Sequence, residues 1–399
     1  MEVNAKPSPT ADLRTIRIDQ VGSLAGPPTL RNALAALDRG EIDAASVARL
    51  MDEAIRASIR RQESIGLPVV TDGEYRRRNF QESFAAAVSG FDAPPQVTTK
   101  DDLSINRAPL ARAEQNFEAR GPAIITRRPV TARLQLVKNV PLEEFELAQP
   151  MATKPVKATL LSADRISQRY AWEASTAIYA DMDAFLADVV AIQRTMVRQL
   201  AQAGCRYIQI DAPGYTAYAD QVSLERMRAR GEDPDRNLER AIAADNAIIE
   251  GFDDVTFGIH LCRGNPRTVD PKTGRIVGQW HREGHYDPIA ERLFNGLRHH
   301  RFLLEYDTER AGSFAPLRFM PKGKVAVLGL VTTKDAEVES SAALERRIGE
   351  AARHLPLEQL ALSPQCGFGG VDPLHPTLTE AEQWAKFERI VEVARNVWR

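Results

Sequence analysis

Two residues that commonly bind metal ions lie close together in the second half of the chain. His260 and Cys262 are two positions apart in a hydrophobic segment, 258–262, that reads as a buried strand running into a glycine turn. On an extended chain, side chains two residues apart leave the same face. Imidazole nitrogen and thiolate sulfur are typical zinc donors. The spacing therefore indicates a zinc site at the end of this strand.

Other polar residues that could do chemistry also end apolar segments. They are Ser23, Asp72, Glu74, Asp211, Glu305, Asp307 and Cys366. When parallel strands form a barrel, the carboxyl ends of the strands surround one mouth, where active sites lie. The residues that fit a four-ligand zinc site with one exchangeable ligand are His260, Cys262, Glu305 and Cys366.

Several of the remaining polar residues have structural interpretations. An unpaired buried carboxylate is costly, so we expect Glu305 to need a cation, and Asp211 to have a cation or an arginine partner. The arginine run 76–78 is expected to form a solvated face, with the alternative that one of the three grips a substrate carboxylate. Cys205, at the opposite end of the barrel, is expected to lie in the core. The other histidines are interpreted as surface or structural residues: His281, His285, His299, His300, His354 and His375.

Strand-like segments alternate with helical patterns along most of the chain. The strands are expected to end near residues 22, 73, 161, 210, 261, 306, 330 and 365. Apolar residues between them recur at spacings of three and four, which predicts amphipathic helices. Eight such units predict a TIM (β/α)8 barrel, formed as a single domain by residues 1–399. An open doubly wound sheet fits less well, because segment 21–26 does not match its glycine-rich phosphate turn.

Residues 92–154 interrupt this alternation after the second strand. They contain prolines, charged residues and a strand-like patch at 123–136, but no long helix with a clear period. We interpret the segment as an insertion within the barrel domain. As a hypothesis, it forms a flap that covers the mouth and excludes water.

The composition of the chain argues against several classes of protein. Its 399 residues, 43% of them hydrophobic, are enough for a large core. The net charge of -2 gives no general attraction to nucleic acid or anionic membranes. No apolar stretch approaches the roughly 20 residues that cross a bilayer, and the N-terminal segment lacks the apolar run of a signal peptide. Because the three cysteines are widely separated, disulfides are not expected. Taken together, these features predict a soluble cytoplasmic enzyme of undetermined oligomeric state.

Six short motifs, in this order, resemble the cobalamin-independent methionine synthase family. They are Val21–Ser23, Thr71–Glu74, Ile208–Pro213, His260–Asn265, Leu304–Glu305 and Ser363–Phe368. The resemblance runs along most of the chain. It is to the catalytic barrel that forms the C-terminal part of the full-length synthase and that also occurs alone.

The resemblance implies a role for each motif. The residues that match the family's zinc ligands are His260, Cys262, Glu305 and Cys366. The residues that match its site for the amino-acid thiol are Val21, Gly22, Ser23, Glu74 and Asp211. In this reading the acids Glu74 and Asp211 face the ammonium group of the substrate. Glu305 is a movable ligand that gives way as the substrate sulfur enters, so Glu305 and Asp211 are the expected catalytic residues.

The implied reaction is zinc-dependent transfer of a methyl group from a donor to a small thiol, with homocysteine as acceptor and methionine as product. A free thiol has a pKa of about 8.5 and is mostly protonated at neutral pH, whereas the thiolate is the nucleophile. Zinc binding to sulfur releases the proton and holds the thiolate in place.

Three differences from the family bear on the donor. The chain has no room for the additional N-terminal barrel with which the full-length synthase binds its polyglutamylated folate donor. The family's Ile-Asp-Glu-Pro pattern has Ala212 in place of the glutamate, and segment 328–334 lacks the synthase's histidine. Thiol addition to an epoxide, or demethylation of another compound, therefore stays an alternative.

Two further alternatives change the class of protein. A barrel that binds a metal or a thiol without turnover has little need of an exchangeable metal site. A metal-dependent hydrolase fits less well still, because two thiolate ligands make zinc a poorer activator of water.

Overall fold

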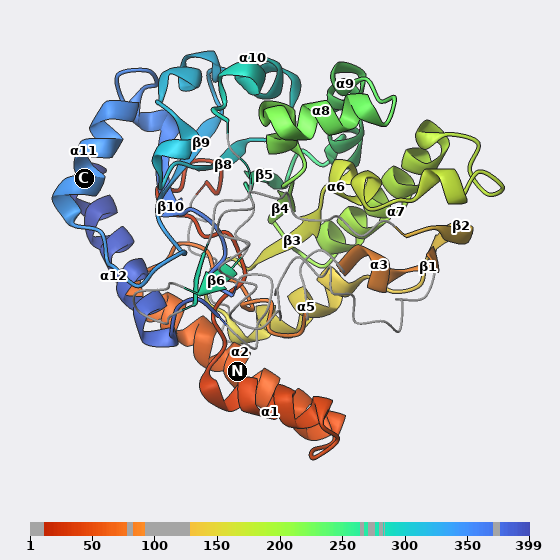
Figure 1. Ribbon diagram of the computed structural model, residues 1–399. Helices are drawn as coiled ribbons and strands as arrows, with labels where there is room; N and C mark the ends of the chain where they lie inside the picture. Colours follow the sequence, from red (N-terminus) through yellow and green to blue (C-terminus); the bar gives the residue numbers. More distant parts are fainter. Residues whose placement is uncertain are drawn as a thin grey trace.

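A parallel sheet forms most of a barrel wall in the computed structural model of this chain, and helices surround it (Figure 1). The structure describes residues 12–77, 83–91, 128–263, 267–269, 276–278, 282, 284–369 and 376–399. The strands follow the order β10-β9-β8-β5-β4-β3 around the wall. Their bounds are β3 Lys157–Leu161, β4 Tyr207–Asp211, β5 Thr256–Leu261, β8 Arg301–Glu305, β9 Val325–Val331 and β10 Leu360–Pro364.

Two N-terminal segments complete the wall. Ile18 forms a parallel bridge with Leu362 of β10, at one edge of the sheet. Val70 forms a parallel bridge with Val156, which directly precedes β3 at the other edge. Six strands and two bridging segments thus give the eight positions of the predicted TIM barrel, and the fold class is confirmed.

The prediction of regular strands over 15–23 and 68–74 is wrong in detail, because each segment makes only a single bridge. Gln62 on the neighbouring helix supplies one reason. Its side-chain amide donates to the Thr71 carbonyl and accepts from the Thr71 amide, both at 2.9 Å, so a helix side chain takes the groups that a ladder would use. The two segments still meet, through a 3.0 Å hydrogen bond from the Leu24 amide to the Gly73 carbonyl.

The helices follow the predicted apolar periodicity. The longer ones are α1 Pro28–Asp38, α2 Ala44–Ile65, α7 Met182–Gln202, α9 Pro234–Ile249, α10 Asp287–Gly296, α11 Ser341–Ala351 and α12 Glu380–Val397. Shorter ones are α3 Ser83–Ala87, α5 Val140–Ala148, α6 Ala163–Gln168 and α8 Gln221–Ala229. Helix α2 ends at Gly66 with a φ of 94°, as its glycine predicts. Helix α12 begins with the predicted capping box of Thr379 and Glu382.

The segment 92–154 is described only in its second half, since residues 92–127 lie outside the described residues. Strand β1, Val88–Phe91, pairs antiparallel with β2, Val130–Leu136, and α5 then leads to β3. A second hairpin joins β6, Arg267–Val269, to β7, Ile276–Gly278, between β5 and α10. The interpretation of 92–154 as an inserted flap stays a prediction.

A buried ionic cluster fills the barrel interior beside the N-terminal segment. Lys157 Nζ donates to Asp19 Oδ1 at 3.0 Å, and Arg301 Nε donates to Asp19 Oδ2 at 2.9 Å. Tyr207 Oη donates to the same carboxylate at 2.6 Å. Burial alone would raise the pKa of Asp19, but the charges of Lys157 and Arg301 bring it below its ordinary value. The cluster therefore ties the N-terminal segment to β3, β4 and β8.

We predict that Asp19→Ala lowers the free energy of unfolding by about 3–5 kcal/mol, because it leaves two buried cations without their anion. Urea unfolding monitored by circular dichroism measures the change. Glu250→Ala is the control, since Glu250 pairs with Arg298 at 2.9 Å on the surface, where an ion pair contributes about 1 kcal/mol or less. Equal losses in the two variants would contradict a structural role for the cluster.

Candidate active site

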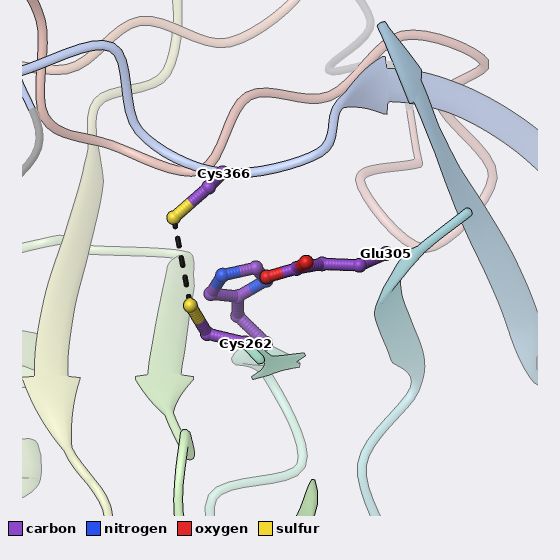
Figure 2. A group of neighbouring side chains, drawn as sticks. Cys262, Glu305 and Cys366 are labelled. Carbon is purple, nitrogen blue, oxygen red and sulfur yellow. Dashed lines mark hydrogen bonds between the residues drawn. The ribbon is translucent and has the colours of Figure 1, made fainter. Parts of the chain in front are cut away.

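The four predicted metal ligands meet at the carboxyl ends of three strands. His260 lies in β5 and Cys262 directly follows it, Glu305 ends β8, and Cys366 lies two residues beyond β10. One nitrogen, one oxygen and two sulfur atoms of these side chains all lie within 4.8 Å of one another. The two sulfurs are 3.6 Å apart. Figure 2 shows Cys262, Cys366 and Glu305 converging on one point.

The chemistry of this cluster fits a metal ion. Among the described residues, neither buried ring nitrogen of His260 has a hydrogen-bond partner of good geometry, and a buried unsatisfied polar atom is costly. The pKa of Cys262 lies well above its ordinary value, first because of its hydrogen bond with Cys366 and then because of burial. A cation among these atoms would satisfy the imidazole and stabilise the thiolates. The donor set, one imidazole, two thiols and a carboxylate, is one that zinc accepts.

Glu305 is a different kind of ligand from the two cysteines. It accepts hydrogen bonds from the Arg263 amide and from Arg310 Nη2, both at 2.7 Å. Burial would raise the pKa of Glu305, but Arg310 and Lys334 outweigh it and bring the pKa to about 2. The expectation that this carboxylate needs a metal cation is therefore wrong, because an arginine already balances its charge. A carboxylate held in this way can leave a metal ion without becoming an unpaired charge.

Two of the predicted thiol-binding residues, Glu74 and Asp211, lie on the β3–β4 side of the mouth, beside the metal ligands. Glu74 is the one non-glycine residue with positive φ in the described chain, at 56°. Its Oε1 accepts from Thr159 Oγ1 at 2.7 Å. Gly22 lies against it with a φ of 140°, and a Cβ at Gly22 would come within 2.8 Å of Glu74 Oε1. The site thus requires glycine at this position.

Asp211 ends β4 and pairs in register with His260 of β5. Its Oδ1 accepts from Gln209 Nε2 at 2.7 Å, and the same nitrogen donates to the Val21 carbonyl at 2.6 Å. The arginine partner expected for Asp211 is replaced by this neutral amide. Gln209 thereby joins the backbone of the N-terminal loop to the acid of β4.

Ser23 connects the two halves of the site. Its carbonyl accepts from the Phe368 amide at 2.8 Å. A Cβ at Gly367 would lie 2.0 Å from Ser23 Oγ. Because Gly367 directly follows Cys366, the loop that holds the thiol-binding backbone packs on the loop that carries a metal ligand.

Arg77 was expected on a solvated face, and the structure places it in the site instead. Its guanidinium donates to both carboxylate oxygens of Glu144 on α5, at 2.6 to 3.0 Å. It also donates to Thr159 Oγ1 at 2.8 Å and lies 3.5 Å from Glu74 Oε1. The neighbouring Arg76 does pair on the exposed surface, with Asp52. The sequence alone does not show that Arg77 is buried and Arg76 exposed, because adjacent side chains in a turn point in different directions.

Several buried carboxyl groups with raised pKa values lie on this side of the mouth. Burial raises the pKa of Asp72 to about 7, and Glu144 adds to the effect. Burial also raises the pKa of Glu74, opposed by Arg77 and reinforced by Asp211. Burial raises the pKa of Asp211 itself. A cation near such carboxyl groups favours their charged form, and an ammonium group is one that a small substrate can bring.

The other residues singled out in the sequence have structural roles. Cys205 is fully buried in the core, as predicted. His299 is buried, and His300 Nδ1 accepts from the Phe257 amide at 2.9 Å. Asp307 forms an ion pair with Lys334. His281 and His375 lie outside the described residues.

Comparison with known proteins agrees with this geometry. A family model for the catalytic domain of the cobalamin-independent synthase matches residues 17–268. The chain belongs to this family. The uncharacterized protein YxjH of Bacillus subtilis is 32% identical over 96% of this chain and 95% of its own length. A methionine synthase of Pyrococcus abyssi is 24% identical over 88% of this chain and 86% of its own length.

A solved structure of the family has the same fold. The B12-independent methionine synthase of a Shewanella species, in complex with selenomethionine, superposes with a TM-score of 0.68. That alignment has 17% identity and covers 96% of this chain and 97% of the other. Among the described helices, none combines the length and apolar character needed to span a membrane.

We predict that Gly22→Ala destabilises the protein by about 1–3 kcal/mol, because it forces an L-residue into an unfavourable φ and against Glu74. Gly349→Ala is the matched control, since a Cβ there meets no atom within 4 Å on helix α11. That change should stabilise the helix by about 0.5–1 kcal/mol. Thermal unfolding of both variants measures the difference, and a neutral Gly22→Ala would argue against the tight contact.

Proposed function

We propose that this protein is a zinc-dependent methyltransferase that moves a methyl group to the sulfur of homocysteine. The observation that carries the proposal is the position of the His260–Cys262–Glu305–Cys366 cluster beside the buried carboxyl groups of Glu74 and Asp211. An amino acid with a thiol side chain has one functional group for each half of this site. Its sulfur suits the metal ligands, and its ammonium group suits the carboxylates.

The metal would be held by His260, Cys262 and Cys366, with Glu305 as the exchangeable ligand. Bound zinc would lower the pKa of a substrate thiol and keep it as the thiolate at neutral pH. Arg310 balances the charge of Glu305 whether or not that carboxylate is on the metal. Two thiolate ligands keep the site electron-rich, which favours attack by sulfur on an alkyl carbon over activation of water.

The carboxyl groups of Glu74 and Asp211 would orient the substrate. Glu74 and Asp211 face its ammonium group from two sides, because Gly22 lies against Glu74 and Gln209 ties Asp211 to the Val21 carbonyl. The backbone of Val21 and Gly22, together with Ser23, would hold the carboxylate end. In this arrangement a thiol with an amino-acid head would reach both halves of the site.

An alternative electrophile fits the same thiolate half-reaction. Ala212 stands beside Asp211 where the family has a second acid, and Lys334, paired with Asp307, occupies the segment where the synthase has a histidine. These differences favour a donor other than the polyglutamylated folate. Another methyl donor or an epoxide would then supply the carbon.

The two cysteines also bear on the compartment. Cys262 Sγ and Cys366 Sγ are 3.6 Å apart and are not joined by a disulfide bond. A disulfide between them would remove both sulfur ligands. We therefore infer a reducing compartment, which the cytoplasm provides.

We predict one zinc ion per purified chain, and methionine as the product when homocysteine and a suitable methyl donor are supplied. Cys366→Ala should lose most of the zinc and all measurable transfer. Cys205→Ala, the matched control, removes a buried core thiol and should keep both. Metal analysis and mass spectrometry of the thiol products measure the two outcomes. Zinc retained in full by Cys366→Ala, or no alkylated homocysteine with folate, non-folate methyl or epoxide donors, would contradict the proposal.

A further inference from the structure

We propose that Gln209 is a positioning residue that makes this site select thiols carrying an amino group over thiols without one. The inference rests on the proposed function and assigns a role to a residue that touches neither the metal ligands nor the reacting sulfur. Gln209 lies in the middle of β4 and is fully buried.

The orientation of the Gln209 amide is fixed by its neighbours. Its Oε1 accepts from Lys157 Nζ at 2.8 Å. A lysine ammonium has donors and no acceptor, so the oxygen of the amide must face it. The nitrogen must then face the other way, where it donates to Asp211 Oδ1 at 2.7 Å and to the Val21 carbonyl at 2.6 Å. Both hydrogens of the amide nitrogen are used.

Lys157 cannot easily move to relax this arrangement. Its ammonium group also donates to Asp19 Oδ1 at 3.0 Å and to the Gln20 carbonyl. Asp19 is in turn held by Arg301 at 2.9 Å and by Tyr207 at 2.6 Å. The side chains of Lys157, Asp19 and Arg301 are fully buried. A rigid ionic cluster therefore sets the direction in which Gln209 presents its N–H groups.

Gln209, the hydrogen-bond partner of Asp211, is uncharged, and this determines what the Asp211 carboxylate can bind. Gln209 holds the Asp211 carboxylate with a neutral donor, so it fixes the orientation of the acid without cancelling its charge. An arginine in this place would form an ion pair and leave little attraction for a substrate ammonium. The same amide holds the Val21 carbonyl next to the acid. The Asp211 carboxylate and a backbone acceptor are thereby fixed side by side, and both can receive N–H groups.

The test compares two thiols that differ only in the amino group. Homocysteine and 4-sulfanylbutanoate share the sulfur, the chain length and the carboxylate. Gln209→Met keeps the volume of the side chain and removes its hydrogen bonds. We expect the Kd for homocysteine, measured by calorimetry on the zinc-loaded protein, to rise at least tenfold, while the Kd for 4-sulfanylbutanoate changes less than twofold. The zinc content should not change.

The control variant is Gln193→Met. Gln193 is also buried, and its amide donates to the backbone carbonyl of Leu161 at the end of β3, not to the Asp211 side chain. It should keep the wild-type preference for homocysteine. If Gln209→Met does not fold, Gln209→Leu tests the same loss of hydrogen bonds with a different shape.

The outcomes separate this inference from the function on which it rests. A variant that keeps the wild-type ratio of the two Kd values, or that loses both thiols equally, would overturn the positioning role. A wild-type protein that binds neither thiol would overturn the proposed function, and the inference would fall with it.

Discussion

The buried carboxylate of Asp19 is the contact on which both the barrel and its mouth depend. It holds Lys157 and Arg301, and Lys157 in turn fixes Gln209. Each link is obligatory for the same reason, since an ionised group inside a barrel must be paired or hydrogen-bonded. The buried polar side chains therefore do more than fill the barrel interior. They fix the position of the Asp211 carboxylate, at the carboxyl end of β4, relative to the N-terminal segment.

The carboxyl groups in the two halves of the mouth have different partners, and this difference determines what each half can bind. On the metal side, Arg310 neutralises Glu305, so this carboxylate can bind or release a metal ion at low cost. On the other side, Asp211 is held by a neutral amide, and one guanidinium, that of Arg77, is shared between Glu74 and Glu144. The first half suits a thiolate on zinc. The second retains negative charge for an ammonium group.

The sequence predicts the parts of this structure that depend on local pattern. The six regular strands, the long helices and the positions of His260, Cys262 and Cys366 follow from apolar periodicity and from the rule that strand ends meet at one mouth. The partnerships of buried side chains do not follow in this way. Gln209 and the Val21 carbonyl are 188 residues apart in the chain, and no local signal joins them, although Gln209 does share a strand face with Asp211.

The same reasoning explains two errors of the sequence analysis, one in a side-chain environment and one in secondary structure. Arg77 looked like one member of a surface run, but Glu144 on a distant helix buries it. The first two barrel segments looked like strands, but Gln62 of α2 takes up the backbone groups of one of them. Local composition indicates which residues are polar. Only the assembled fold shows which of these residues face one another across the mouth.

The central claim is that a substrate thiol becomes a metal ligand at this cluster. Zinc X-ray absorption of the wild-type protein, recorded with and without homocysteine, tests it most directly. The account predicts that homocysteine adds one sulfur to the zinc coordination shell and removes the oxygen of Glu305. A shell that is unchanged by saturating homocysteine would contradict it.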